Sequence, residues 1–408
     1  FAPNNAAIER FLFEQDSIYW ASVAKHESNP EMFKIVETGI HSPKLEDLSD
    51  EKCGEIARNH ILPKMYYGTD FTGNSIADAN MNERDLTLNI TEDGSWLINS
   101  EAKVKWEEET ENGVVHILEG VVNPSSLDVP TLLNDYSYFS LFMEALNKTG
   151  YSDALTKTMD NTYTEGDKIV QSIRDKEMAP YPANRRYGFT IFLESNEVFA
   201  KAGVTDFNSL VEMCRREYPE TMDVWSNDGN EMAKVDHSAP LTDWRNPVNQ
   251  FVGYHILDRK VAYENLVCYN ISIEGFESKK DFLTTSDRIE YYITMNNRIL
   301  KVTMPRSEQK EEIYLNYAAD DKGQNIRVYS PNDFKRQNPE LHGEYNPEAL
   351  NGALNVIGDV LLYKEEIMKS HVLKCIMRFD SSSLFSELTN NRIRWRKASN
   401  LTGDGSVF

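Results

Sequence analysis

A stretch near the first third of the chain is repeated near its end. The sequence NGVVHILEGVV occupies residues 112–122, and a variant, NGALNVIGDVLL, occupies residues 351–362. Each copy begins with Asn-Gly, a strong hairpin signal, because both residue types tolerate the positive φ angles of a tight type I′ turn. Apolar residues then fall on both faces, which favours a strand covered on both sides. We therefore expect six strand residues to be buried: Val114, Ile117, Val121, Val356, Ile357 and Val360.

Two more paired features precede the repeated strand, in the same order. The sequence Asn-His-Ile-Leu at residues 59–62 matches Tyr-His-Ile-Leu at residues 254–257. Further back, residues 1–7 and 192–199 share a Phe followed four residues later by Asn. From Phe to His the distance is 59 residues in the first copy and 63 in the second, whereas the second copy holds about 44 more residues between His and Asn-Gly. The pattern predicts one ancestral unit present twice, as two tandem domains, with the extra residues in surface loops or added hairpins.

These three features resemble the motifs of the fasciclin, or FAS1, domain family. That family is known for a first motif similar to Phe-Ala-Pro-x-Asn-x-Ala-Phe, a central Tyr-His and a closing Asn-Gly-Val-Ile-His-x-Ile-x-x-Val-Leu. This chain shows all three twice, over roughly residues 1–125 and 134–365. Departures from the pattern occur at four positions. These are Asn59 in place of Tyr, Leu193 and Glu194 in place of Ala-Pro, and Asn355 in place of the closing His.

The resemblance implies an α+β chain of two tandem FAS1-like domains, each a β-sandwich or wedge flanked by helices. The first domain would span residues 1–127, with its N-terminal part missing, and the second residues 134–365, with insertions. Residues 366–408 would form a C-terminal extension, in which residues 384–394 resemble a segment of fasciclin-like surface proteins of Bacteroidetes.

Site residues also follow from the resemblance. The binding role of the family's Tyr-His pair carries over to four positions: Asn59, His60, Tyr254 and His255. The other motif positions are structural: Phe1, Asn5, Asn112, Gly113, His116, Phe192, Asn196, Asn351 and Gly352. The residues themselves indicate packing at Tyr254 and His255, because at helical spacing at least one ring turns toward the apolar side. A half-buried His satisfies one ring nitrogen with a protein partner, so we expect this pair to be mainly structural.

Fasciclin domains chiefly mediate adhesion through protein or glycan contacts and use no cofactor. The resemblance therefore implies a non-enzymatic binding protein whose partner is an extracellular protein or glycan. It also implies a place at the cell surface or in the periplasm, with a lipid anchor on an N-terminal segment absent from this sequence. The alternative is an envelope carbohydrate-active or small-ligand-binding protein. A deep apolar pocket with convergent polar groups would favour the alternative, and an exposed aromatic patch would favour adhesion.

The residues at the start of the sequence predict that a helix precedes the first motif. Phe1 is preceded by neither an initiator Met nor a signal peptide, which is typical of a processed or engineered fragment. Residues 138–150 place apolar side chains at helical spacing and end with Gly150 at a C′ position, which predicts a helix ahead of the second Phe motif. The first copy should have an equivalent helix ahead of Phe1.

Length and charge limit the classes of function. A chain of 408 residues is long enough for two or three domains with real cores. Its formal net charge of −22 would repel phosphate backbones, which argues against a nucleic-acid partner. No apolar run approaches the roughly 20 residues that span a bilayer, so we expect no transmembrane segment in this sequence.

Metal and thiol chemistry is not indicated by the sequence. Four cysteines lie scattered at Cys53, Cys214, Cys268 and Cys375, with no Cys-x-x-Cys pair. We expect four buried thiols, with two long-range disulfides as the alternative. Residues 223–236 are rich in Asp, Asn and Gly but miss the EF-hand spacing, so we expect a turn-rich loop there instead of a calcium site.

Catalytic motifs are absent from the sequence as well. There is no Gly-x-Ser-x-Gly elbow, no His-x-x-x-His pair and no nucleotide-binding glycine pattern. A metal site made of His60, His116 and His255 would need those side chains to converge, so structural histidines are the simpler interpretation. Glycosidase carboxylates stay open, because their partners can be far apart in sequence.

Periodicity and turn residues predict the remaining elements. Helices are expected over residues 8–19, 48–62, 207–218 and 241–257, the second capped by Ser49 or Asp50. Strands are expected over residues 86–90, 96–98, 102–106, 289–293, 299–304, 314–317 and 326–329. The Pro- and Ser-rich residues 124–130 are the predicted boundary between the two copies.

Overall fold

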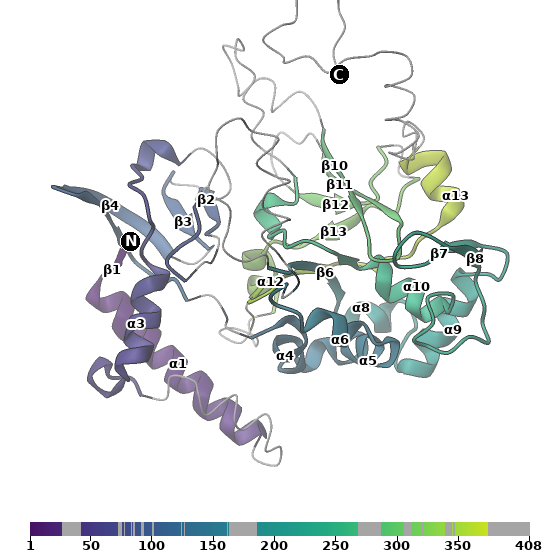
Figure 1. Cartoon of the computed structure of the whole chain (residues 1–408), viewed down its shortest axis with the longest axis horizontal. Helices are drawn as coiled ribbons and strands as arrows, with labels where there is room; N and C mark the ends of the chain where they lie inside the picture. Colours follow the sequence, from purple (N-terminus) through teal and green to yellow (C-terminus); the bar gives the residue numbers. More distant parts are fainter. Residues whose placement is uncertain are drawn as a thin grey trace, which may run out of the picture.

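The described part of the chain forms a five-stranded sheet, an eight-stranded sheet and a two-stranded hairpin, with helices packed against the two larger sheets (Figure 1). The computed structural model describes residues 1–26, 42–71, 76, 78–82, 84, 86–90, 94–99, 102–123, 125, 127–160, 162, 186–267, 287–305, 312–319, 322–338, 345 and 347–373. The mixture of helices and sheets is the α+β class that the sequence predicts. The domain boundaries at residues 127, 134 and 365 stay predictions.

The first sheet has five strands in the order β1-β5-β4-β3-β2. Its strands are β1 Ala2–Pro3, β2 Leu88–Ile90, β3 Trp96–Ile98, β4 Ala102–Thr110 and β5 Gly113–Leu118. The helices in the same part of the chain are α1 Asn5–His26 and α3 Asp50–Asn59, with the 3₁₀ turns η1 Leu45–Asp47 and η2 Gly68–Asp70. The first core lies on this sheet and includes Phe71, Leu86, Ile98, Leu118 and Val122.

The second sheet has eight strands, in the order β10-β11-β12-β13-β15-β6-β9 with β14 paired to β15. Its strands are β6 Phe189–Glu194, β9 Ile256–Leu257, β10 Arg288–Ile293, β11 Ile299–Met304, β12 Ile313–Leu315, β13 Ile326–Val328, β14 Glu348–Ala349 and β15 Gly352–Ile357. A separate hairpin joins β7 Asp223–Trp225 to β8 Met232–Lys234.

Helices lie along β6 in the second half of the chain, where Figure 1 shows α4, α5, α6 and α8 together below the strand. The α-helices are α4 Val129–Asn134, α5 Ser140–Thr149, α6 Tyr151–Leu155, α8 Asn196–Lys201, α9 Phe207–Glu217, α10 Pro247–Tyr254, α12 Pro331–Gln337 and α13 Glu365–Ile367. The shorter turns are η3 Ser137–Phe139 and η4 Tyr263–Asn265, and a π-helix, η6, spans Met368–Val372.

The repeated strand takes the same place in both sheets. β5 runs parallel to β1 with Ile117 opposite Ala2, and β15 runs parallel to β6 with Val356 opposite Leu193. This register makes Ile117 equivalent to Val356. It likewise matches each Asn, Gly and Phe of the motifs in the first sheet with its counterpart in the second. The backbone nitrogen of each motif Phe bonds to the carbonyl oxygen of its own motif His, at 2.9 Å in the first sheet and 3.0 Å in the second.

Asn-Gly marks a hairpin in both copies, but the glycine is not in the turn. Gly113 is already the first residue of β5, and Gly352 is the first residue of β15. Neither glycine nor the Asn before it has a positive φ, so the type I′ prediction is wrong. At Gly352 the requirement is steric, because a Cβ there would lie 2.3 Å from Val129 Cγ2 of α4. At Gly113 such a Cβ would meet only Thr110 Oγ1, at 3.7 Å.

Coverage of the repeated strand differs between the two sheets. All six residues of β15 are buried, whereas only His116 and Leu118 of β5 are. The prediction of burial is confirmed for Val121, Val356, Ile357 and Val360. It is wrong for Val114 and Ile117, which are half-buried. In the described part of the chain, helices α4 to α6 have no counterpart over β5.

Two predicted elements need correction. The helix expected over residues 241–257 spans only Pro247–Tyr254, because Asn246 caps it with its side chain and Pro247 begins it. His255 ends that helix and β9 follows. The stretch expected to be a loop at residues 223–236 is the hairpin of β7 and β8, with Gly229 at a φ of 73° in its turn.

Most of the other predicted elements are confirmed, with shifted ends. The helix after the first motif runs longer than expected as α1, and α3 is capped by Ser49 as predicted. Gly150 ends α5 with a φ of 79°, as its C′ position requires. Residues 163–185, residues 384–394, Cys268 and Cys375 lie outside the described residues.

The two parts of the chain touch where the linker enters the second sheet. The Leu350 backbone N–H donates to the Leu127 carbonyl at 2.7 Å, and the Val129 N–H donates to Asn351 Oδ1 at 3.0 Å. From the first part, the buried Arg84 side chain donates to the Ala349 carbonyl at 3.1 Å. The turn before β15 is therefore held by both the linker and the first part of the chain.

The contrast between the two glycines predicts that substitution by alanine lowers stability much more at Gly352 than at Gly113. Gly352→Ala should lower the free energy of unfolding by about 1 to 3 kcal/mol, because the new methyl group overlaps α4. Gly113→Ala should change it by about 0.5 kcal/mol or less, because the space is open and φ is not positive. Urea unfolding of both variants measures the difference, and equal losses would contradict the steric explanation.

Candidate functional site

The motif histidine of the first copy connects the end of a helix to the end of the motif strand. His60 is the C-cap of α3 and is 4% exposed. Its Nδ1 lies 2.7 Å from the Ile56 carbonyl oxygen and therefore donates to it. Its Nε2 accepts the Val122 backbone N–H at 2.9 Å. Both ring nitrogens are used by the neutral ring, and burial lowers the pKa of His60 below its ordinary value.

The motif histidine of the second copy makes the same connection through a carboxylate. His255 is the C-cap of α10, is fully buried, and its Nδ1 donates to the Phe251 carbonyl at 2.7 Å. Its Nε2 lies 2.7 Å from Glu194 Oε1, and that oxygen also accepts the Leu361 N–H at 2.9 Å. Glu194 stands at the register position of Pro3. In the first copy the His ring accepts the backbone N–H directly, whereas in the second copy the Glu194 carboxylate lies between the His ring and the backbone N–H.

The residues that precede the two histidines are buried too. Tyr254 is fully buried, and its hydroxyl donates to the Ile299 carbonyl at 3.2 Å and accepts from Asn316 Nδ2 at 3.0 Å. Burial raises the pKa of the Tyr254 phenol. Asn59 is 2% exposed, and its Oδ1 accepts from Asn82 Nδ2 at 2.7 Å. All four residues to which the family resemblance gives a binding role therefore lie inside the protein.

The closing position of the motif differs between the copies. His116 is buried, its Nε2 donates to the Tyr66 carbonyl at 2.7 Å, and its ring lies 5.2 Å from the ring of Phe1. Burial lowers the pKa of His116. Its counterpart Asn355 is 1% exposed, and neither atom of its amide group has a partner in the described part of the chain. The substitution of His by Asn thus removes a hydrogen bond and a ring contact.

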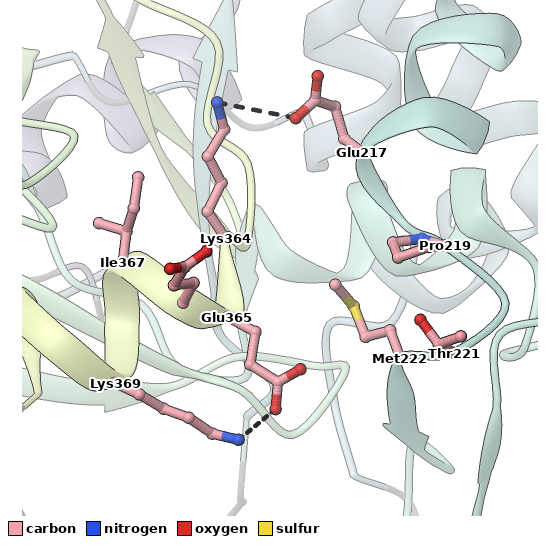
Figure 2. Close-up of a pocket in the computed structure, with 9 residues that line it drawn as sticks. Glu217, Pro219, Thr221, Met222, Lys364, Glu365, Ile367 and Lys369 are labelled. Carbon is pink, nitrogen blue, oxygen red and sulfur yellow. Dashed lines mark hydrogen bonds and ion pairs between the residues drawn. The ribbon is translucent and has the colours of Figure 1, made fainter.

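A shallow groove lies apart from the motif residues. It has a volume of about 570 Å³ and is bordered by the end of α9 and by α13, as Figure 2 shows. Its lining residues are Glu217, Pro219, Thr221, Met222, Lys364, Glu365, Glu366, Ile367 and Lys369. Two of the carboxylates lie beside lysines, Glu217 with Lys364 at 3.7 Å and Glu365 with Lys369.

The cysteines and histidines of the described residues are the candidates for metal and thiol chemistry. There, no three His, Cys, Asp or Glu side chains come together as a metal site. Cys214 is buried and free, as expected, and burial raises the pKa of its thiol. Cys53 is free but only half-buried, so the expectation of burial is wrong for that residue. His60, His116 and His255 each use protein partners.

Comparison with known proteins agrees with the motif geometry. Residues 32–124 match the model of the fasciclin domain. Within those residues the chain is therefore similar to a fasciclin domain. The matched residues include α3, its C-cap His60, and β2 to β5, the last of which is the first copy of the repeated strand. No helix in the described residues is long and apolar enough to cross a membrane.

Other comparisons add little to that match. The solved FAS1 domain pair from the insect cell adhesion molecule fasciclin I is similar at 14% identity, covering 90% of this chain and 88% of that one. Its TM-score is 0.31, too low to support an argument about fold or function. None of the curated proteins compared with the chain matches it.

Two contributors to these sites escaped sequence reasoning. Glu194 was visible only as a departure from the fasciclin motif, although an acidic residue directly after the apolar run Phe189–Leu193 is itself a signal of a buried partner. Asn351 was taken as a turn residue, but its Nδ2 donates to the carbonyls of Leu155 and Lys157 at 2.7 and 2.8 Å. Its amide thus holds the start of α4 and the end of α6.

The neutral state of His60 predicts a pH dependence confined to the first copy. Burial lowers its pKa below 6.5, so its contribution to stability is present above pH 6.5 and is lost as the pH falls through the lowered value. Protonation removes the acceptor of the Val122 N–H. Hydrogen exchange should therefore show the Val122 amide losing protection as the pH falls below 6.5, after correction for intrinsic rates, while the Leu361 amide, which bonds to a carboxylate, keeps its protection. Equal loss at both amides would contradict this.

The bridge in the second copy can be tested by two substitutions at one position. Glu194→Ala leaves His255 Nε2 and the Leu361 N–H without partners, and should cost about 3 to 5 kcal/mol of unfolding free energy. Glu194→Gln can keep an oxygen at that position to accept from Leu361, so it should cost less, about 1.5 kcal/mol. Urea unfolding measures both, and equally destabilised variants would reject the bridge.

Proposed function

We propose that this chain is a non-enzymatic binding protein that mediates adhesion at a cell surface or in a periplasm. Its partner is an extracellular protein or a glycan. The fasciclin-domain match over residues 32–124 carries the proposal, because fasciclin domains in general mediate adhesion or binding. A lipid anchor and a bacterial source belong to the same proposal and rest on the family resemblance alone.

The buried motif residues support adhesion through other surfaces. Tyr254 and His255 are fully enclosed, so a partner would have to unfold the end of α10 to reach them. His60 and Asn59 are enclosed in the same way. The exposed aromatic residues of the first part include Phe13 and Trp20 on α1 and Trp106 on β4. Aromatic side chains on a surface are typical of protein and glycan contacts.

The alternative, a carbohydrate-active or small-ligand-binding protein, requires a pocket with convergent polar groups. The groove beside α13 is open, and two of its carboxylates, Glu217 and Glu365, lie beside lysines. A glycosidase places two carboxyl groups on either side of the scissile bond, whereas Glu217 and Glu365 are each paired with a lysine. This geometry favours adhesion over catalysis in the described part of the chain.

A binding array followed by one variant tests the proposal. The chain is screened against immobilised glycans and extracellular matrix proteins, and at least one saturable partner is expected. His255→Ala should lower the melting temperature, because it leaves Glu194 and the Phe251 carbonyl without their partner, but leave the affinity of the folded fraction unchanged. Asn208→Ala on the exposed side of α9 is the control for both measurements. Lost binding with unchanged melting would instead make the end of α10 the adhesive site, and no partner in the array together with hydrolysis of a glycan would reject the proposal.

A further inference from the structure

The hydrogen bonds around His255 fix where its protons lie. The Phe251 carbonyl oxygen lies 2.7 Å from Nδ1 and can only accept, so Nδ1 carries a proton. The other ring nitrogen, Nε2, lies 2.7 Å from Glu194 Oε1. A neutral ring protonated at Nδ1 has a lone pair at Nε2, and an ionised carboxylate also presents only lone pairs. Their close approach therefore requires a proton between the two atoms.

The burial of the two side chains points to the same proton. Both are fully buried, and a charge in the interior is costly unless an opposite charge or hydrogen bonds compensate it. Glu194 Oε1 accepts the Leu361 N–H, but Oε2 has no hydrogen-bond partner in the described part of the chain. An ionised Glu194 beside a neutral His255 would be a poorly compensated anion. One shared proton removes that cost, as a carboxylic acid or as an imidazolium beside the carboxylate.

The first copy has no place for such a proton. His60 Nε2 accepts the Val122 backbone N–H at 2.9 Å, so this nitrogen is unprotonated in the folded chain. Pro3 stands at the register position of Glu194 and has no ionisable side chain. The folded second copy therefore binds one proton more than a neutral His and an ionised Glu, whereas the first copy holds only a neutral His.

The titratable groups packed around the pair are uncharged near neutral pH. Cys214 on α9 is fully buried, and the pKa of its thiol is raised, first by burial and then by the Glu194 carboxylate. Burial also raises the pKa of Tyr218 on α9 and of Tyr254 on α10. From α5 the neighbour is an aromatic ring, that of Phe142, which lies 5.2 Å from the His255 ring.

Charged side chains on the neighbouring elements have other partners or face solvent. Arg298, which is 9% exposed, donates to the Asp223 carbonyl and lies 4.3 Å from the ring of Tyr363. Glu217 on α9 pairs with Lys364 at 3.7 Å. The other charged residues of α5, α8, α9 and the turn after β15 are exposed or form surface ion pairs, and they are Glu144, Lys148, Glu197, Lys201, Glu212, Arg215, Arg216 and Asp359. Within the described residues, the buried pair therefore balances its own charge.

We propose that the folded second copy holds one extra proton between Glu194 and His255, and that the two copies therefore respond to pH in opposite directions. In the unfolded chain the same two residues carry one proton between about pH 4.3 and 6.5, and none above that range. The second copy is therefore most stable in that range and loses stability as the pH rises, because its folded state binds more protons than its unfolded state. In the first copy, the lowered pKa of His60 gives the reverse, a loss as the pH falls. This property of the interior goes beyond adhesion and holds whichever partner the chain binds.

Urea unfolding at several pH values tests the proposal with one matched variant. Pulsed hydrogen exchange over residues 189–194 of the full chain reports β6 and so measures the second copy by itself. Glu194→Gln keeps an oxygen that can accept the Leu361 N–H but has no titrating carboxyl group. Between about pH 7 and 8, the folding equilibrium constant of the unaltered chain should fall about tenfold relative to that of the variant. The other titratable groups cancel in this ratio, and a ratio that stays constant would overturn the proposal.

A measurement on the unaltered chain covers the case in which Glu194→Gln does not fold. Nuclear magnetic resonance of the full chain, with isotope-labelled histidine and glutamate, reads both members of the pair. At about pH 8, either His255 Nε2 or the Glu194 carboxyl group should give the resonance of a protonated group, whereas His60 Nε2 should be unprotonated. An unprotonated Nε2 together with an ionised Glu194 would show that the proton is absent and would overturn the proposal.

Discussion

The arrangement of each motif depends on one buried histidine that joins the end of a helix to the end of the repeated strand. His60 and His255 both cap their helices and donate from Nδ1 to the carbonyl four residues earlier. The other nitrogen satisfies the backbone N–H that follows the strand, directly at Val122 and through Glu194 at Leu361. Because an unpaired backbone N–H in the interior is costly, this connection fixes where the strand ends relative to the helix.

The two copies of the repeated strand are buried to different extents. β15 lies inside an eight-stranded sheet with α4 against Gly352, whereas β5 lies in a five-stranded sheet and leaves Ile117 half-buried. The same motif fits both sheets, because the residues that the two copies share supply hydrogen bonds and, at the glycine, the absence of a side chain. Gly352 is packed against α4 in the second copy, whereas Gly113 has open space beside it in the first.

The interior position of the motif residues also limits how a fasciclin domain of this kind can recognise a partner. Burying Tyr254 and His255 uses their polar atoms to satisfy Phe251, Ile299 and Glu194, and leaves none directed to solvent. Recognition then has to come from surface residues whose identity the motif does not constrain.

The sequence alone determined the α+β class, the order of the paired motifs, most of the helices and strands, and the packing role of the motif histidines. The class follows from the resemblance of the paired motifs to the fasciclin family, and the helices and strands follow from periodicity and caps, which act over a few residues. Only the tertiary structure decided that neither Asn-Gly forms a type I′ turn, that Gly352 allows the close approach of α4, that Glu194 bridges His255 to Leu361, and that Ile117 is left half-buried. Each of these depends on a contact between segments tens to hundreds of residues apart, and local sequence patterns carry no information about which segments meet.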